Sequence, residues 1–411
     1  MRGLNWRALL FAAGVITGTS LITIRAQALY TSHHLGVNHQ VHDLNDHGEM
    51  VGEYLGTIQH GILSDGAAWI PTGLNGDDFD WSALYGINNN HYAVGLNTVR
   101  PEGITSLTVH AVRVHRDTPF NLVNLGSLTG ENGNARARAI NNANVAVGDS
   151  ADAVGRRRAV RFDVDGEVTD LGSLGGDNST AIDINDRGDI AGESSNFQGQ
   201  TRGFFLGEDG ILRDIGTLGG EETFVTRMTA QGEIGGLSMT IARTTRAFVY
   251  ANGEMKDLGT LGGRESVAYG INDAGVIVGA AMKTNGAYTA FIKYPGQPMV
   301  DLASLVRVPF PDALIYAKAI DNRGMIIARG SKDASNYMLK PGAFTLEIRG
   351  DVLAVEFAAP PNTEVILETS QSLTTWTPFL TNTIATEPIL IERPLNSDPS
   401  FFRATVSLSS N

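Results

Sequence analysis

The sequence predicts an all-β protein: a seven-bladed β-propeller of four-stranded repeats, each of about 44 residues, followed by a small β-sandwich. Three observations lead to this prediction. Three short phrases recur along most of the chain in a fixed order and at a nearly constant interval. The 48 glycines and the scarcity of long apolar helical patterns favour short strands joined by tight turns. A hydrophobic content of 42% supplies enough apolar side chains for a core of ordinary size.

The clearest phrase ends a strand with Ile-Asn and continues through a turn that contains glycine, as in "INDRGDIAG" from Ile184 and "INDAGVIVG" from Ile271. Seven copies are recognisable, and their final residues are 52, 95, 148, 192, 236, 279 and 328. The intervals between them are 43, 53, 44, 44, 43 and 49 residues. Repetition at this length indicates architecture, because a catalytic loop is needed only once.

Each repeat divides into four short β patterns. The first strand ends in Ile-Asn, the second follows the Asn-Asp-x-Gly turn, the third contains Ala-Phe, and the fourth contains Asp-Leu-Gly. Four strands of about six residues and four connections of about five residues give roughly 44 residues. The phrase "DLGTLGG" at 257–263 is therefore expected to carry the chain from one blade to the next. Its leucines would pack between sheets, and its glycines would allow a close crossing.

The start of the mature chain is expected to close the ring. Residues 29–36 ("LYTSHHLG") align with the fourth strand of a repeat, whereas the last repeat ends after its third strand near Pro341. Pairing of 29–36 beside 336–341 would complete the seventh blade and hide its sheet edge. An open β-solenoid is the structural alternative.

The first 28 residues read as an export signal. Arg2 and Arg7 form a basic segment, an apolar stretch follows over 8–24, and a small-x-small cleavage site ends at Ala28. An uncleaved membrane anchor is the alternative, which the glycines and hydroxyl side chains of the stretch disfavour. We expect a secreted or cell-envelope protein without a membrane-spanning segment after cleavage. The predicted divisions of the chain are a signal peptide at 1–28, the propeller at 29–342 and a C-terminal β-sandwich-like domain at 343–411.

Net charge and the absence of cysteine narrow the function classes. A formal net charge of −13 argues against nucleic acid as a partner. With no cysteine in the chain, disulfides, thiolate metal sites and cysteine nucleophiles are excluded. Beyond 342 the repeats stop, and several runs of alternating apolar and polar residues are typical of a small β-sandwich.

The recurring phrases resemble the bacterial HAF-type extracellular repeat family, whose repeats combine DLGTLGG, IND-x-G-x-VVG and HAF. The resemblance covers roughly residues 29–343 and depends on three motifs in one order. Arg158, Arg202 and Arg246 replace the His of that family. The resemblance implies export and a repeat fold, and no particular activity. "LETSQSLTTWTPF" and "FFRA" in the C-terminal part resemble a β module at the ends of exported bacterial proteins.

No catalytic constellation is recognisable, so we expect no enzyme, no cofactor and no metal site. Neither G-x-S-x-G nor H-E-x-x-H occurs, and no carboxylate stands isolated in the apolar setting that shifts a pKa. Five histidines between His33 and His47 lack a ligand spacing, which favours structural or surface roles. "DVDGEVTD" at 163–170 resembles part of a calcium loop, but the next repeats lose its acids, and an acidic hairpin turn is expected.

A set of arginines near the start of the third strand forms the candidate ligand site. The predicted ligand-binding residues are Arg156, Arg157, Arg158, Arg202 and Arg246. The last three occupy one place in consecutive repeats, so a propeller would set them in an arc. Such an arc suits an acidic glycan or another carboxylated ligand. The alternative is that these arginines pair with second-strand acids such as Asp149 and Glu193.

The loops between the second and third strands differ most among the repeats, which is how loops come to carry recognition. Connections of an up-and-down blade alternate between its two ends, so these loops should share a face with the Gly-Gly crossings. The predicted function is a non-catalytic binding or adhesion scaffold, and its partner is an extracellular or envelope glycan or protein. The alternatives are a propeller hydrolase or lyase acting on polysaccharide, with carboxylates or histidines in the central channel, and a purely structural envelope component.

Overall fold

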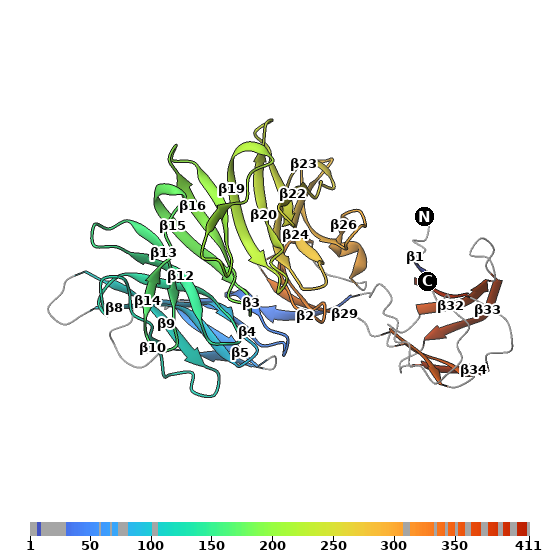
Figure 1. Ribbon diagram of the computed structural model, residues 1–411. Helices are drawn as coiled ribbons and strands as arrows, with labels where there is room; N and C mark the ends of the chain where they lie inside the picture. The colour runs from blue at the N-terminus through green and yellow to red at the C-terminus, as the bar shows by residue number, and fades with distance from the viewer. Residues whose placement is uncertain are drawn as a thin grey trace. The chain divides into compact units, whose positions relative to one another are not determined.

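A computed structural model describes residues 30–56, 59–65, 68–72, 81–100, 106–306, 313–332 and 335–341 in full, and residues 6–9 and six segments beyond 343 as strands only. The chain divides into two compact units, and the unit made of His33–Ser304 and Phe310–Leu339 contains the repeats. Over the described residues, the repeats form seven four-stranded sheets, which are the blades of a β-propeller (Figure 1). The predicted all-β, seven-bladed architecture is confirmed.

Blades 1 to 6 share one pattern, in which four consecutive strands lie side by side in chain order and pair antiparallel. In blades 1 to 3 the strands are β3 (His39–Leu44), β4 (Met50–Leu55), β5 (Gln59–Ser64), β6 (Trp69–Pro71), β7 (Ser82–Ile87), β8 (Tyr92–Val99), β9 (Thr108–His115), β10 (Val123–Asn124), β11 (Ala135–Ile140), β12 (Ala146–Ala151), β13 (Arg157–Phe162) and β14 (Val168–Asp170). In blades 4 to 6 they are β15 (Gly175–Ile184), β16 (Ile190–Asn196), β17 (Thr201–Leu206), β18 (Leu212–Asp214), β19 (Gly219–Met228), β20 (Ile234–Thr240), β21 (Thr245–Ala251), β22 (Glu254–Asp257), β23 (Gly262–Ile271), β24 (Ile277–Lys283), β25 (Tyr288–Lys293) and β26 (Val300–Asp301). A short 3-10 helix, η1 (Leu302–Leu305), follows blade 6.

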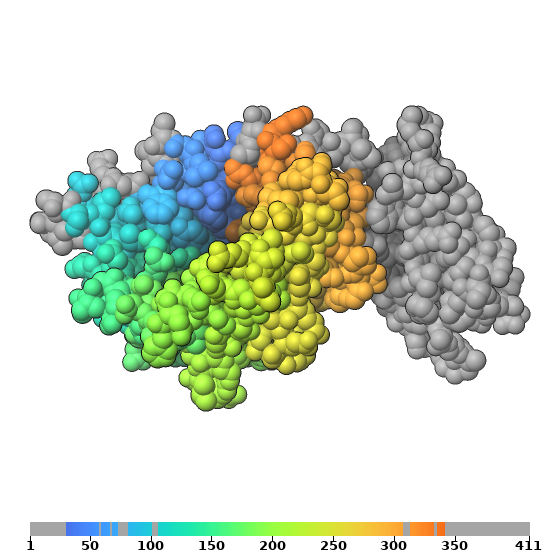
Figure 2. All heavy atoms as spheres, turned by 90° about the horizontal axis from the view of Figure 1, so that it is seen from above, coloured from blue at the N-terminus to red at the C-terminus, as the bar shows by residue number. Residues whose placement is uncertain are grey.

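The seventh blade combines both ends of the repeat region. Its strands, in sheet order, are β2 (Tyr30–Gly36), β29 (Asn336–Pro341), β28 (Ile326–Gly330) and β27 (Leu314–Ile320). The hydroxyl of Thr31 donates to the carbonyl of Lys340 at 3.3 Å. In Figure 2 the atoms of the first blade (blue) lie beside those of the last (orange). The N-terminal strand therefore closes the ring as predicted, and the open solenoid is excluded.

The hydrophobic core lies between neighbouring sheets. Phe204, from the third strand of blade 4, is fully buried and packs against Ala139 and Ala159 of blade 3. Leu258 and Leu261 of the phrase DLGTLGG pack in the cluster that joins blades 5 and 6. The phrases recur because every blade needs the same apolar contacts with its neighbour.

Each inner strand contains a β-bulge two residues before the end of the strand. In blade 3 the bulge lies at Arg138, and Gly148 of the second strand pairs with the preceding residue, Ala137. A Cβ on Gly148 would lie 1.9 Å from the carbonyl oxygen of Arg136. No larger residue fits without moving the backbone, which explains the final glycine of the phrase in blades 1 to 6. Blade 7 has Ala328 there.

The connections define two faces of the propeller. The turn face carries the Asn-Asp-x-Gly turns and the hairpins between third and fourth strands. The crossing face carries the connections between second and third strands together with the Gly-Gly crossings, since Gly175 pairs with Asn196 and Gly219 with Thr240. The predicted distribution of loops between the two faces is confirmed.

The other compact unit contains two antiparallel sheets. One has β30 (Phe344–Arg349), β31 (Val352–Phe357) and β34 (Ile389–Pro394), and the other has β1 (Trp6–Leu9), β35 (Phe401–Leu408), β32 (Thr363–Ser370) and β33 (Thr377–Ile384). That these sheets form a sandwich stays a prediction. The predicted signal peptide lies outside the described residues except for β1, which cleavage after Ala28 would remove. In the described part of the chain, no helix has the length and apolar character to cross a membrane.

Candidate functional site

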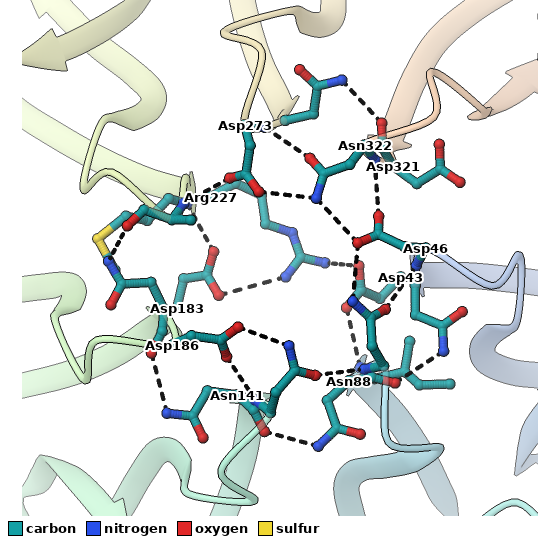
Figure 3. Close-up of a pocket in the computed structure, with 18 of the residues that line it drawn as sticks. Asp43, Asp46, Asn88, Asn141, Asp183, Asp186, Arg227, Asp273, Asp321 and Asn322 are labelled. Atoms are coloured by element: carbon teal, nitrogen blue, oxygen red, sulfur yellow. Dashed lines mark hydrogen bonds and ion pairs between the residues drawn. The ribbon is translucent and has the colours of Figure 1, made fainter.

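The inner strands end at the turn face in a ring of amide side chains (Figure 3). Asn141 is typical: its Oδ1 accepts the backbone N–H groups of Ala143 and Val145, both at 3.1 Å. Its Nδ2 donates to the carbonyl of Asn185 in the next blade, also at 3.1 Å. The same donation to the next blade occurs from Asn45 to Asn88, from Asn88 to Asn141 and from Asn272 to Asp321. The asparagine therefore holds its own turn and binds the neighbouring blade, which is why the phrase recurs.

The residues that directly follow these asparagines form a second ring. In this ring the backbone N–H of one blade donates to a side-chain oxygen of the next blade. At 2.7–3.0 Å the bonds run from Asp46 to Asn89, Asn89 to Asn142, Asn142 to Asp186, Ala230 to Asp273, Asp273 to Asn322 and Asn322 back to Asp46. The last bond joins the seventh blade to the first. Ala230 has no side-chain oxygen, so the ring is interrupted between blades 4 and 5.

Three charged side chains meet on the axis next to these rings. Arg227 of β19 lies between Asp43 of β3 and Asp183 of β15 (Figure 3). Its guanidinium contacts Asp43, and its Nη1 lies 3.8 Å from Oδ1 of Asp183. Burial raises the pKa of both aspartates, that of Asp183 to about 6, although Arg227 opposes the shift. Together with the amide rings they line a cavity of about 190 Å³.

A second cavity of about 220 Å³ is lined by the seven bulge residues. They are His42, Tyr85, Arg138, Ile182, Thr226, Tyr269 and Lys318. Arg227 and Val225 complete the lining. A bulge turns two successive side chains toward one side of the strand, so each blade contributes a pair of positions to the axis. We call this space the bulge cavity; all seven bulge side chains keep part of their surface accessible to solvent.

Besides Arg227, two basic side chains at the bulge cavity have acidic partners. Nε of Arg138 lies 3.1 Å from Oδ1 of Asp149. Nε2 of His42 lies 3.2 Å from Oε1 of Glu53, and Oε2 of this glutamate accepts the indole N–H of Trp81 at 3.1 Å. Both acids stand on second strands behind the inner strands, so they hold the basic side chains from the side away from the axis.

Lys318 differs from these residues. Within the described residues it forms no hydrogen bond and no ion pair, and its Nζ lies 5.5 Å from the ring centroid of Tyr269. Burial and the nearby guanidinium of Arg227 lower the pKa of Lys318, whereas Asp43 opposes the shift. The bulge cavity therefore contains an ammonium group without a contacting acid.

Glu193, on the second strand of blade 4, corrects one expectation. Burial raises its pKa to about 7, although Arg138 and the backbone N–H of Val225 oppose the shift. Glu193 is thus a partly buried carboxylate with a shifted pKa, whereas the sequence led us to expect none. The inner strand of blade 5, which contains Val225, lies beside Glu193 and contributes to its burial. The sequence of blade 4 by itself does not show this neighbour.

The structure places the predicted arginines at the crossing-face ends of blades 3, 4 and 5. Three of them pair with the aspartate of their own blade's Asp-Leu-Gly or Asp-Ile-Gly phrase, at 3.0 Å, 3.1 Å and 4.0 Å: Arg158 with Asp170, Arg202 with Asp214 and Arg246 with Asp257. The suggested second-strand partners are therefore wrong, since Asp149 pairs with Arg138. Asp149 pairs with Ala159 and so points to the other face of the sheet from Arg158, whereas Asp170 pairs with Val160 and shares the face of Arg158.

The other two predicted arginines lie in and after the loop that precedes β13. Arg156 contacts Asp152 at 2.8 Å and Asp177 at 3.7 Å. Arg157 is exposed and forms no side-chain ion pair within the described residues. Highly exposed apolar side chains stand on the same crossing-face loops: Val154, Phe197 and Ile241 are 74%, 85% and 85% exposed.

The other sequence motifs have local contacts. Among the residues that the structure describes, no group of three or more His, Asp or Glu side chains is arranged to hold a metal ion. The ring of His39 stacks on Trp69 with centroids 4.9 Å apart. In the acidic hairpin, Asp163 lies 2.9 Å from the guanidinium of Arg161.

The axial residues were not among those predicted from the sequence. The available signal was the pair of residues before each Ile-Asn, which includes His-Asp, Arg-Ala, Ile-Asp, Thr-Arg and Lys-Ala within otherwise apolar strands. Strict alternation sends two successive side chains to opposite faces of a sheet. Only the bulge brings both positions to the axis, and the pattern alone did not predict it.

Fold and site together define the class of the chain as a seven-bladed β-propeller with a polar, charged axis. No family model and no curated protein matches it. Among solved structures it is similar to TolB from Acinetobacter baumannii, with 14% identity and a TM-score of 0.41, over 76% of this chain and 80% of that one. It is also similar to YCF48 bound to a D1 peptide, with 11% identity and a TM-score of 0.46, over 78% and 99% of the two chains. A gluconolactonase from Xanthomonas campestris has 10% identity and a TM-score of 0.35, over 78% and 100%.

Proposed function

We propose that the chain is an exported, non-catalytic binding scaffold that holds an acidic polysaccharide of the cell envelope on the crossing face of blades 3 to 5. The observation that carries the proposal is the position of three highly exposed apolar side chains, Val154, Phe197 and Ile241, on the loops next to the five arginines. Exposed apolar side chains that gather within a polar rim often mark a surface that binds a partner.

The chemistry of this face suits a polyanionic sugar chain. Aromatic and aliphatic side chains pack against the C–H faces of sugar rings, and guanidinium groups form paired hydrogen bonds with carboxylates. Arg158 and Arg202 each contact one aspartate, but a guanidinium has five N–H donors, so donors remain for a ligand. Arg157 contributes a full charge.

Export and membership of the HAF-type repeat family belong to the same proposal. The export signal at 1–28 and the recurring phrases support both, and residues 343–411 are assigned to a β-sandwich that follows the propeller. Mass spectrometry of the secreted protein should find Leu29 at its N-terminus; a chain that keeps residues 1–28 after secretion would contradict the cleaved signal.

The binding test compares two double variants of the mature chain with equal change in net charge. Arg157→Glu with Arg202→Glu alters the crossing face, and Arg187→Glu with Arg323→Glu alters the turn face, where both arginines also contact aspartates. We expect the first pair to weaken binding of polygalacturonate about tenfold or more, and the second to leave it within about twofold.

A third variant removes an apolar contact without changing charge. Phe197→Ser should also weaken polygalacturonate binding, because the exposed ring would no longer pack against a sugar. Equal loss in the two double variants would show nonspecific attraction, and loss only in the turn-face variant would assign binding to the other face. Either result, or no binding by the unaltered chain, overturns the proposal.

A second candidate is a hydrolase or lyase acting on polysaccharide, which the axial carboxylates favour. Asp183 has a pKa raised to about 6, so it can hold a proton close to neutral pH. Release of new sugar ends from a panel of polysaccharides, abolished by Asp183→Asn, would support this candidate. If no polysaccharide of the panel is cleaved, the hydrolase or lyase is contradicted, and the binding scaffold stays the proposed function.

A further inference from the structure

The bulge cavity has an ordered distribution of charge around the axis. Besides His42 of blade 1, its basic side chains are Arg138, Arg227 and Lys318 from blades 3, 5 and 7, so these three stand two or three blades apart around the ring. Tyr85 and Tyr269 come from blades 2 and 6, and each neighbours a blade with a cation. No acidic side chain lines the cavity in the described part of the chain.

The acids that contact these cations are not part of the bulge-cavity lining: Asp149 stands on a second strand, and Asp43 and Asp183 line the neighbouring axial cavity. Asp149 contacts Arg138, and Asp43 and Asp183 contact Arg227. Each guanidinium keeps further N–H donors for the axis. Lys318 has no contacting acid among the described residues, and an ammonium in a poorly solvated position is stabilised by any anion that reaches it. The lining thus contains three cationic groups, of which Lys318 alone has no contacting acid among the described residues.

We propose that the bulge cavity binds a small organic polycarboxylate, whose carboxylates contact Arg138, Arg227 and Lys318 and whose carbon skeleton lies between Tyr85 and Tyr269. This site lies on the axis and is independent of the polysaccharide surface proposed above. Three separated cations favour a ligand with more than one negative charge. The apolar and aromatic part of the lining favours an organic ligand over a bare inorganic anion.

The size of the cavity agrees with a small molecule. A volume of about 220 Å³ is roughly seven times the ~30 Å³ that one water molecule occupies in the liquid. This volume is too small for a polymer and larger than a single phosphate or sulfate requires. The bulge side chains keep accessible surface, which allows a ligand to reach them.

The test measures binding of citrate by isothermal titration calorimetry to the mature chain, with inorganic phosphate and glucose as comparisons. Citrate should bind saturably at one site per chain, and phosphate should bind about tenfold more weakly or less. Lys318→Met should weaken citrate binding about tenfold or more, because it removes one charged contact and keeps the side-chain length. Lys256→Met, at an exposed lysine of β22 that contacts Glu254, is the matched control and should not change the affinity.

Folding of the variants can be separated from binding. Loss of a partly buried ammonium without an acidic partner should leave Lys318→Met at least as stable as the unaltered chain. Ile182→Phe provides a second variant that fills part of the cavity without changing charge, and it should also abolish citrate binding. Equal citrate affinity in Lys318→Met and the unaltered chain overturns the proposal, as does no citrate binding or tighter binding of phosphate. The two sites are tested separately: the crossing-face variants, which should lose polygalacturonate binding, should bind citrate as the unaltered chain does.

Discussion

Glu193 shows how a neighbouring blade changes the protonation of one side chain. The inner strand of blade 5 covers it, the backbone N–H of Val225 donates to it, and burial raises its pKa to about 7 from an ordinary value of 4.5. The folded chain therefore binds this proton more tightly than the unfolded chain does. Stability contributed by the protonated form is present below about pH 4.5 and is lost as the pH rises toward 7. Asp183 shifts in the same direction, to about 6.

At this scale we predict that Glu193→Gln stabilises the chain at alkaline pH. Glutamine keeps an acceptor for Val225 and carries no charge, so the free energy of unfolding at pH 8 should exceed that of the unaltered chain by about 2 kcal/mol. At pH 4 the two chains should be equally stable, since Glu193 is then protonated. Urea unfolding at several pH values measures the difference. Glu254→Gln on the exposed β22 is the control, with a change of less than about 0.5 kcal/mol; a less stable Glu193→Gln at pH 8 would be inconsistent with the burial argument.

At the scale of the element, the turn after each inner strand both ends its own blade and fastens the next. Asn141 makes three hydrogen bonds from one side chain, two within its turn and one to blade 4. Thr229 of blade 5 lacks the amide, and its hydroxyl accepts only the N–H of Glu233 at 3.1 Å. The hydrogen bonds between adjacent blades therefore differ around the ring, and the side-chain contributions of the Asn-Asp pair are missing where Thr229 and Ala230 replace it.

Asn141→Ala should lower the free energy of unfolding by about 3 kcal/mol, because it removes one donor to the carbonyl of Asn185 and leaves two turn N–H groups without their acceptor. Asn285→Ala is the matched control on an exposed crossing-face turn, where the side chain accepts one N–H at 3.1 Å. Its cost should stay below about 1 kcal/mol. Thermal and urea unfolding of both variants check the difference. Similar costs at the two sites would mean that the bond between blades contributes little.

At the scale of the whole molecule, the ring is held together by contacts between its first and last blades. Asn322 of blade 7 donates twice to Asp46 of blade 1, at 3.0 Å and 3.1 Å. The strand β2 supplies the outer edge of blade 7, and the carbonyl of Leu35 accepts the indole N–H of Trp69 in blade 1 at 3.2 Å. Closure thus removes one exposed sheet edge and joins the two ends of the repeat region.

Removal of residues 30–36 from the mature chain should lower its melting temperature by roughly 10 °C, since one strand is lost and the edge of β29 becomes exposed. A synthetic peptide of residues 29–38 should restore part of this loss, and a peptide of the same composition in scrambled order should not. Differential scanning calorimetry with each peptide makes the comparison. An unchanged melting temperature after the deletion would show that β2 does not hold the ring.

The number of blades, their strand order, the closing strand and the two faces follow from the sequence by itself. They depend on local patterns, such as a turn after Ile-Asn or a glycine pair at Gly175. Each pattern occurs in several repeats, so it can be recognised more than once. Only the tertiary structure decided which acids pair with the predicted arginines, how Glu193 is covered, and which cations meet in the bulge cavity. Arg138, Arg227 and Lys318 are about 90 residues apart along the chain and meet because the ring closes and each inner strand bulges. Charge and pKa depend on everything within a few ångströms, and no window of sequence contains neighbours that the fold brings from other blades.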